Sequence, residues 1–413
     1  MILPSVFSVN SFEEAVTVEL AQNHSSFFDM MAIVIIKSCL MFTNWVLNLL
    51  KRGCFSSATH VPSHVVIYTC GTLGDNILMI PAVAAVRACY AEANITLIAF
   101  CGAFTSTLQQ IWKQTSYVNN LVCLTKESVQ RHGVRICIDK DKLIDIKCDL
   151  FINLSPLGNR GCLGQVIREM LLARFLGARQ AIGFRLNSYN RKNRFNRVQH
   201  LFMQNEARRP RMVLQELDIS PIENIDLLSH DGAVKMAVEK ILREVGVVVG
   251  NGPMILLNPG SKLAASRWPA ERFGELAKWL VETYSAQVLI NGVESEKDIC
   301  DEVVHTSGDL AKSLAGKLSV QELIELLRLC DACISNNTGT MTLAAMLKIP
   351  LIVISSTRFS PTFYMPISDK MIWLFSFSKT SYSYHDGDDV SEDLLPIGVR
   401  DVTTAYEQLI REC

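Results

Sequence analysis

The sequence predicts an α/β protein built from two successive doubly wound domains that face a cleft, with a hydrophobic helical extension before them. Three observations support this prediction: strands alternate with helices in two series, 413 residues exceed what one core usually serves, and an apolar stretch comes first. We expect an extension over 1–60, an N-terminal domain over 61–225, a C-terminal domain over 226–395 and a C-terminal helix over 396–413.

The composition indicates a folded, globular chain without a strong electrostatic field. It is 49% hydrophobic and 20% charged, with a net charge of −1, so nucleic acid is not expected as a partner. Thirteen cysteines follow no regular spacing and no Lys or Arg precedes Lys37, which favours reduced thiols in the cytosol. The pair Cys330 and Cys333 could have a metal or redox role, but the favoured interpretation is that both are small buried hydrophobic side chains.

The extension contains an apolar stretch, Met30–Leu50, about as long as a bilayer is thick. A charge at Lys37 is costly inside a membrane span. On a helix it shares one face with three other polar residues: Asn44, Asn48 and Lys51. This favours a helix lying in the membrane surface, with Trp45 as an interfacial anchor and Lys51 and Arg52 at the lipid headgroups. A spanning helix, and a helix packed on the protein itself, remain the alternatives.

Both domains alternate between apolar strands and helices. In the first, strands are expected at 64–70, 94–102 and 148–156, and helices at 76–93 and 164–178, the last ending at Gly177. In the second, strands are expected at 253–260, 286–294, 333–340 and 350–356, and helices at 271–285, 319–332 and 341–348. Such an order gives parallel sheets covered by helices, which bind ligands at the carboxyl ends of their strands.

Three strand-to-helix loops carry residues suited to chemistry. In the first, GTLGDN at 71–76, Asp75 either caps the following helix or acts as a general base toward a hydroxyl. In the second, Ser261 offers a hydroxyl and Lys262 and Arg267 offer charge to a pyrophosphate, unless the loop only caps a helix. The third enters a helix through small polar residues that suit an anion: Asn337, Thr338, Gly339 and Thr340.

These motifs resemble glycosyltransferase family 9, the ADP-heptose:lipopolysaccharide heptosyltransferases and their relatives. The resemblance runs from about Val65 to Ile410 and rests on four segments: VVIYTCGTLGDNILMIPAVAAVR, LLARFLGARQAIGF, LLNPGSKLAASRWPAERFGELAKWL and LAGKLSVQELIELLRLCDACISNNTGTMTLAAMLKIPLIVI. It implies a GT-B fold of two Rossmann-like domains, an inverting transfer, and a donor held mainly by the C-terminal domain. It also implies that Asp75 is the general base and that Glu294 lies near the donor nucleoside.

The chain departs from the family pattern at three donor-side positions. The Lys before Trp-Pro is Ser266, the Asp of Asp-Thr-Gly is Asn337, and the His that follows is Thr342. The resemblance therefore implies either a donor other than ADP-heptose or a reduced activity. A non-catalytic relative that binds nucleotide or scaffolds a glycan-assembly complex is the alternative function, and an epimerase of the same fold is a further one.

On the acceptor side the sequence offers Gly74 and a basic run. The run has eight basic residues: Arg185, Arg191, Lys192, Arg194, Arg197, Arg208, Arg209 and Arg211. It is either a solvated face or a landing surface for a phosphorylated, lipid-linked acceptor. The expected partners are a nucleotide-sugar donor of the ADP-sugar kind, a lipid-linked or lipopolysaccharide core acceptor and the cytoplasmic face of the inner membrane. No cofactor and no metal are implied.

Overall fold

The computed structural model describes residues 6–9, 27–55, 61–100, 105–113, 115–125, 129–132, 135–138, 143–156, 163–185, 207–222, 231–356, 365–376 and 392–412. Residues 6–9, 27–37, 129–132 and 135–138 are described by their backbone alone. The chain divides into two compact units. The N-terminal unit is Asn23–Ser229, and the C-terminal unit joins Met1–Gln22 to His230–Cys413.

The N-terminal unit is built on a five-stranded parallel sheet with the order β4-β3-β2-β7-β8. Its strands are β2 (His64–Cys70), β3 (Asn94–Phe100), β4 (Asn120–Leu124), β7 (Leu150–Asn153) and β8 (Gln180–Ile182). The inner strands read as nearly continuous apolar runs because helices cover both of their faces. A separate antiparallel pair, β5 (Val129–His132) and β6 (Arg135–Ile138), lies between β4 and β7 in the chain.

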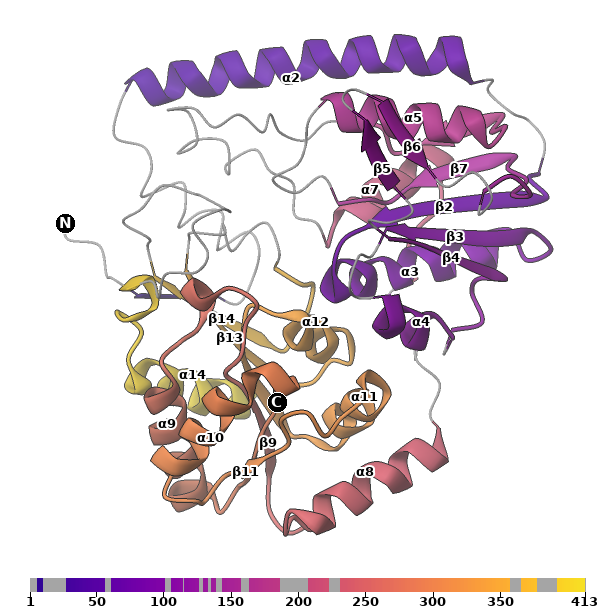
Figure 1. Ribbon diagram of the computed structural model, residues 1–413. Coiled ribbons are helices and arrows are strands. Elements are labelled where there is room, and N and C mark those ends of the chain that lie inside the picture. The colour runs from indigo at the N-terminus through magenta and orange to yellow at the C-terminus, as the bar shows by residue number, and fades with distance from the viewer. Residues whose placement is uncertain are drawn as a thin grey trace. The chain divides into compact units, whose positions relative to one another are not determined.

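Helices cover both faces of this sheet (Figure 1). α3 (Leu73–Cys89) and α4 (Thr105–Lys113) lie on one side, and α5 (Leu163–Phe175) lies on the other. α5 ends before Gly177, as the sequence predicts. The short α7 (Arg209–Leu214) contacts α3 and completes the unit.

The C-terminal unit is built on a seven-stranded sheet with the order β1-β14-β13-β12-β9-β10-β11. Its strands are β1 (Val6–Val9), β9 (Met254–Asn258), β10 (Gln287–Ile290), β11 (Lys312–Ser313), β12 (Ala332–Asn336), β13 (Leu351–Ser356) and β14 (Met371–Ser376). All pairs are parallel except β1 with β14, in which Val6 lies opposite Ser376. The first strand of the chain thus extends the edge of the second sheet.

Two groups of helices cover this second sheet (Figure 1). α9 (Ala270–Tyr284), α10 (Lys297–Thr306) and α14 (Val399–Glu412) share one apolar core with the strands. The other α-helices described in this unit are α8 (Gly232–Glu244), α11 (Val320–Leu329) and α12 (Gly339–Met346), and α8 contacts α11. α11 begins where its sequence requires, because Ser319 and Glu322 form a reciprocal capping box. The two doubly wound α/β sheets confirm the predicted fold class.

The predicted extension over 1–60 is divided between the units. β1 joins the C-terminal sheet, whereas α2 (Phe27–Cys54) belongs to the N-terminal unit. There Leu47 and Phe55 are buried in the same core as α5. The helix over 396–413, predicted as a separate segment, starts at Val399 and is part of the C-terminal core.

α2 packs on the N-terminal unit through the face that carries Lys51. The ammonium Nζ of Lys51 lies 2.6 Å from Oε2 of Glu216, and both side chains are mostly buried. This ion pair turns Lys51 toward the protein, so the expected placement of Lys51 at lipid headgroups is not what the structure shows. None of the helices described is long and apolar enough to cross a membrane.

Candidate active site

The C-terminal unit gathers polar residues at the carboxyl ends of three neighbouring strands. β9 ends at Asn258, β12 ends at Asn336, and Asn291 directly follows β10. All three asparagine side chains are buried. Because buried amides need hydrogen-bond partners, their contacts define how the loops are held.

Asn291 joins the loops after β9, β10 and β12. Its Nδ2 donates to Oδ1 of Asn258 at 2.7 Å and to the hydroxyl of Thr340 at 3.3 Å. Asn258 in turn donates to the hydroxyl of Thr338 at 3.4 Å. The first residues of α12 are therefore tied to both neighbouring loops.

Asn336 makes a second connection between the same loops. Its Nδ2 donates to the carbonyl of Pro259 at 2.7 Å, and its Oδ1 accepts from the backbone N–H of Trp268 at 3.1 Å. One side chain thus holds both ends of the 259–268 loop. We call Asn258, Asn291 and Asn336, with these contacts, the asparagine network.

The 259–268 loop carries the predicted cations. Arg267 donates from Nε to the carbonyl of Ser261 at 2.8 Å, so this guanidinium braces the loop from within. Lys262 is exposed, whereas Ser261 is buried. Ser266, at the position where the family has Lys, lies in a short 3₁₀ turn over Ala264–Ser266.

The loop after β12 leads into the N-terminus of α12. The helix begins at Gly339, with Thr338 as its N-cap. Its first N–H groups have no partner within the helix, and they carry the positive end of the helix dipole. Asn337 is half-buried beside them, and Thr342 is buried in the first turn, where its hydroxyl donates to the carbonyl of Thr338 at 3.5 Å. These groups can hold an anion.

Two carboxylates lie at the same edge of the sheet. Glu294 rests against Gly316, where a Cβ would lie 1.9 Å from Oε2 of Glu294. Glu296 lies over Gly260, where a Cβ would lie 2.2 Å from the carboxyl carbon. Only glycine allows Glu296 to approach the Pro-Gly loop this closely. Glu296 stands two residues after Glu294 in the same loop, but no motif in the sequence distinguishes it, so its position over Gly260 was not predicted.

In the N-terminal unit, Asp75 lies in the first turn of α3. Its Oδ2 accepts from the N–H of Thr72 at 2.6 Å and from the Thr72 hydroxyl at 3.0 Å. Gly71 has a φ of 132°, and a Cβ there would lie 2.5 Å from the same oxygen. The capping role considered for Asp75 is therefore present in the structure.

The environment of Asp75 also changes its proton affinity. Burial raises the pKa of Asp75 above its ordinary value, and the hydrogen bonds from Thr72 oppose that rise without cancelling it. A carboxylate with a raised pKa is a stronger base than an exposed one. Capping and proton transfer are therefore compatible in one side chain.

The remaining acceptor-side residues fall into two groups. Gly74 lies in the first turn of α3 beside Asp75, and Arg185 is exposed after β8. Arg191 and Lys192 lie outside the described residues, as do Arg194 and Arg197.

Arg209, from the predicted basic run, is buried. It donates to the carbonyls of Ser155 at 2.9 Å and Gly183 at 3.2 Å. Arg209 is thus a structural residue, which corrects its assignment to a solvated face or an acceptor-binding surface.

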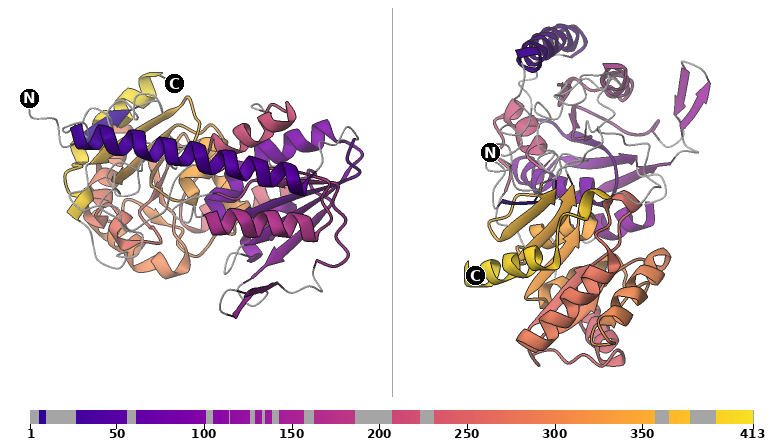
Figure 2. Two further views of the ribbon diagram at one scale, coloured as in Figure 1. Left: turned by 90° about the horizontal axis from the view of Figure 1, so that it is seen from above. Right: turned by 90° about the vertical axis from the view of Figure 1, so that its left-hand side faces the viewer.

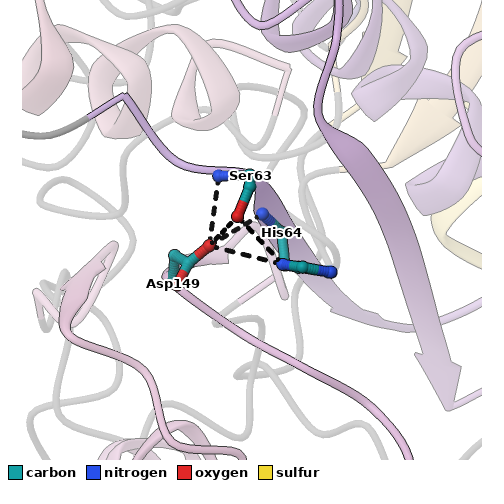
Figure 3. A network of polar contacts seen from close by, with 3 residues as sticks. All are labelled: Ser63, His64 and Asp149. Carbon is teal, nitrogen blue, oxygen red and sulfur yellow. Dashed lines mark hydrogen bonds and ion pairs between the residues drawn. The ribbon is translucent and has the colours of Figure 1, made fainter.

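A Ser-His-Asp cluster lies at the amino ends of strands β2 and β7, at the end of the N-terminal sheet away from the Asp75 loop (Figure 3). Ser63 precedes β2, His64 is the first residue of β2, and Asp149 precedes β7. Nδ1 of His64 lies 3.1 Å from the Ser63 hydroxyl and 3.5 Å from Oδ2 of Asp149. A catalytic triad uses different ring nitrogens for serine and aspartate, so this cluster does not have that geometry. It pins the start of β2 to the start of β7.

The cysteines of the Cys330–Cys333 pair are both buried. Burial raises the pKa of Cys330 well above the ordinary value and that of Cys333 to about 12, so both thiols are protonated at neutral pH. This supports their interpretation as small hydrophobic side chains. Among the described residues, no group of three or more His, Cys, Asp or Glu side chains could hold a metal ion.

Known structures of similar shape define the class of fold. The glycosyltransferase family 9 protein of Veillonella parvula superposes with a TM-score of 0.62 at 20% identity, covering 87% of this chain and all of that one. The ADP-heptose LPS heptosyltransferase II of E. coli superposes with a TM-score of 0.54 at 20% identity, covering 84% and 99%. At such identities the likeness shows the fold alone, which is the two-sheet GT-B-like fold.

The sequence itself identifies the family. Residues 166–388 match the model of glycosyltransferase family 9 (heptosyltransferase), which is more than half of the chain. The protein belongs to this family. The match contains the asparagine network and the loops it joins, whereas Asp75 lies before it.

Curated relatives match over shorter stretches. Lipooligosaccharide heptosyltransferase 2 of Haemophilus influenzae is 30% identical over 127 residues, 30% of this chain and 36% of the relative. The protein of the same name from Campylobacter jejuni is 29% identical over 171 residues, 40% of this chain and 52% of the relative. The chain thus spans about a third to a half of the length of these relatives.

Proposed function

We propose that the chain is an inverting glycosyltransferase that transfers a heptose-like sugar from a nucleotide-sugar donor to a lipopolysaccharide or related cell-envelope acceptor. The observation that carries this proposal is the asparagine network, which joins three strand-end loops within the segment that matches the family. Curated relatives with the name heptosyltransferase 2 support the sugar class. A structural neighbour solved with ADP, the E. coli heptosyltransferase WaaC, supports an ADP-sugar as donor.

On this proposal the C-terminal unit holds the donor. The N-terminus of α12, Lys262 and the N–H groups of the 259–268 loop bind the diphosphate. Arg267 contributes indirectly, because its hydrogen bond to the carbonyl of Ser261 fixes the conformation of this loop. Glu294 and Glu296 accept hydrogen bonds from sugar or ribose hydroxyls, because an ionised carboxylate is a hydrogen-bond acceptor and a hydroxyl can donate to it.

The N-terminal unit supplies the base and takes the acceptor. Asp75 removes the proton from the acceptor hydroxyl while that oxygen attacks the anomeric carbon from the face opposite the diphosphate. The glycosidic bond forms as the bond to the diphosphate breaks, which inverts the configuration. The diphosphate leaves with its developing charge stabilised by the α12 N-terminus and Lys262. With a lipid-linked acceptor, the reaction takes place at the cytoplasmic face of the inner membrane.

The test uses the full chain, because removing residues before Val61 would take Leu47 and Phe55 out of the N-terminal core. Purified protein is incubated with a panel of nucleotide sugars, and binding and slow donor hydrolysis are recorded. Selective binding of one donor, with hydrolysis lost in Asp75→Asn and binding kept, supports the proposal. Nucleotide binding without turnover of any donor or acceptor identifies a non-catalytic relative instead.

A further inference from the structure

The N-terminal unit exposes large apolar side chains along two helices. On α2 the outer face carries four of them, Met41, Phe42, Trp45 and Leu49, between 47% and 74% exposed. Four residues that recur every fourth position form a stripe on α5: Leu163, Ile167, Leu171 and Phe175, between 37% and 63% exposed. We call these eight residues the two-helix face.

Both parts of this surface belong to one side of the N-terminal sheet. The inner residues of α2 and α5, among them Leu47, Val166 and Met170, share one core cluster with the strands. Figures 1 and 2 show α2 and α5 on the same side of that sheet. Since their inner faces meet a common core, each outer face points away from that core.

The exposed charges described on α2 and α5 themselves have one sign. Arg52 lies on the outer face of α2, and Arg168 and Arg174 flank the stripe of α5 on its two sides. In α5 and the side chains described for α2, the one acidic residue is Glu169, which is buried. Its carboxylate accepts hydrogen bonds from Asn153, Ser155 and Gln165 inside the unit.

We propose that the two-helix face docks on an anionic lipid bilayer, with the apolar side chains at the boundary between headgroups and acyl chains. Apolar helix faces with an exposed tryptophan, whose helices expose only basic charges, have the composition of surfaces that lie in a membrane interface. A second copy of the chain fits less well, because it would bring arginines against arginines. The proposed membrane location thus falls on the two-helix face, and binding of this face to a bilayer does not require the transfer reaction.

Three sets of changes test this assignment in the full chain. Phe42→Ser with Trp45→Ser alters α2, and Leu171→Ser with Phe175→Ser alters α5. Arg52→Gln with Arg174→Gln removes charge alone. Met236→Ser, on the exposed side of α8 in the other unit, is the matched control, since Met236 is 65% exposed.

Binding is measured by co-sedimentation with vesicles of phosphatidylcholine, with and without phosphatidylglycerol. We expect binding only to the anionic vesicles, a partition coefficient lowered about tenfold by each apolar pair, and no change for the control. The arginine pair should weaken binding by about tenfold at low salt and less at high salt. Nucleotide binding should stay unchanged in every variant, which separates this result from a failure of the proposed transfer.

Trp45 gives a direct readout of depth. Quenching of its fluorescence by brominated lipids should be present in the native chain and lost in Trp45→Phe, which should still bind vesicles. Equal binding to neutral and anionic vesicles would overturn the charge argument, and undiminished binding of the α5 variant would remove α5 from the surface. Concentration-dependent dimers, lost in the same variants and without vesicle binding, would make the face an interface between copies.

Discussion

The two sheets hold their strand-end loops in different ways. In the C-terminal unit, Asn291 and Asn336 bond loops that follow different strands, so the candidate donor site is one connected structure. In the N-terminal unit, the side-chain contacts of the Asp75 carboxylate come from Thr72, three residues earlier in the same turn. We infer that the donor site depends on the whole C-terminal unit, whereas the geometry of the proposed base depends on one helix N-terminus.

The largest effect on turnover is expected for Asp75→Asn, which changes the proposed base and leaves the donor site intact. An amide oxygen can still accept both bonds from Thr72, so the cap should survive while turnover falls about 100- to 10,000-fold. Burial raises the pKa of the native carboxyl. At a pH above this raised pKa, ionised Asp75 therefore lowers the free energy of unfolding. At neutral pH the variant should therefore be as stable as the native chain or more stable. Steady-state rates and urea unfolding check this, and unchanged turnover would remove Asp75 as the base.

The acid limb of the pH-rate profile tests the same residue in the native chain. Proton transfer requires ionised Asp75, so the rate should fall as pH drops through its raised pKa, at a pH above the ordinary aspartate value of 3.8. A rate that stays constant down to that ordinary value would show that the group does not limit turnover.

Asn336→Ala tests the connected side of the comparison. It leaves the carbonyl of Pro259 and the N–H of Trp268 without their partner in a buried place, at a cost of about 2–4 kcal/mol in the free energy of unfolding. Nucleotide affinity should fall with it. The control is Asn337→Ala, which changes the next side chain, half-buried, and should cost much less. Equal stability of the two variants in urea unfolding would mean that the loops do not depend on the network.

The cations of the 259–268 loop should show a smaller effect. Lys262→Ala and Arg267→Ala should each lower the affinity for ADP by about tenfold, the first by removing charge and the second by releasing Ser261. Affinity for adenosine, which lacks the diphosphate, should hardly change with Lys262→Ala. Calorimetric titration measures both, with the exposed Lys278 on α9 changed to Ala as the control. Parallel losses for ADP and adenosine would place Lys262 away from the diphosphate.

The smallest effect is expected at Asp149, far along the strands from the Asp75 loop. Burial would raise the pKa of Asp149, but hydrogen bonds from Ser63 and His64 hold it below the ordinary value. Its contribution is thus present at neutral pH and lost as pH falls through the lowered pKa. Asp149→Asn should cost about 1 kcal/mol or less at pH 7, since the group is about a third exposed. The difference in melting temperature should vanish in acid, while turnover stays unchanged.

Sequence reasoning predicted the architecture well because it rests on local patterns. Buried parallel strands such as 254–258 are nearly continuous apolar runs, and the helix that follows begins directly after Trp-Pro, so each element can be predicted without its neighbours. Local patterns also predict the three ligand-binding loops that contain Asp75, Lys262 and Thr338, because ligand-binding residues follow strands in such folds. The family resemblance then added roles that spacing alone does not give.

What the sequence determined by itself is the order of strands and helices, the three strand-end loops and the family. Only the tertiary structure decided that Asn258, Asn291 and Asn336 form one network, because their partners lie 33 to 80 residues away. It also showed that Arg209 is buried on backbone carbonyls and that α2 turns Lys51 inward to Glu216. Such contacts depend on which elements pack against each other in the folded chain. The periodicity of side chains along the sequence predicts the elements but not how they pack.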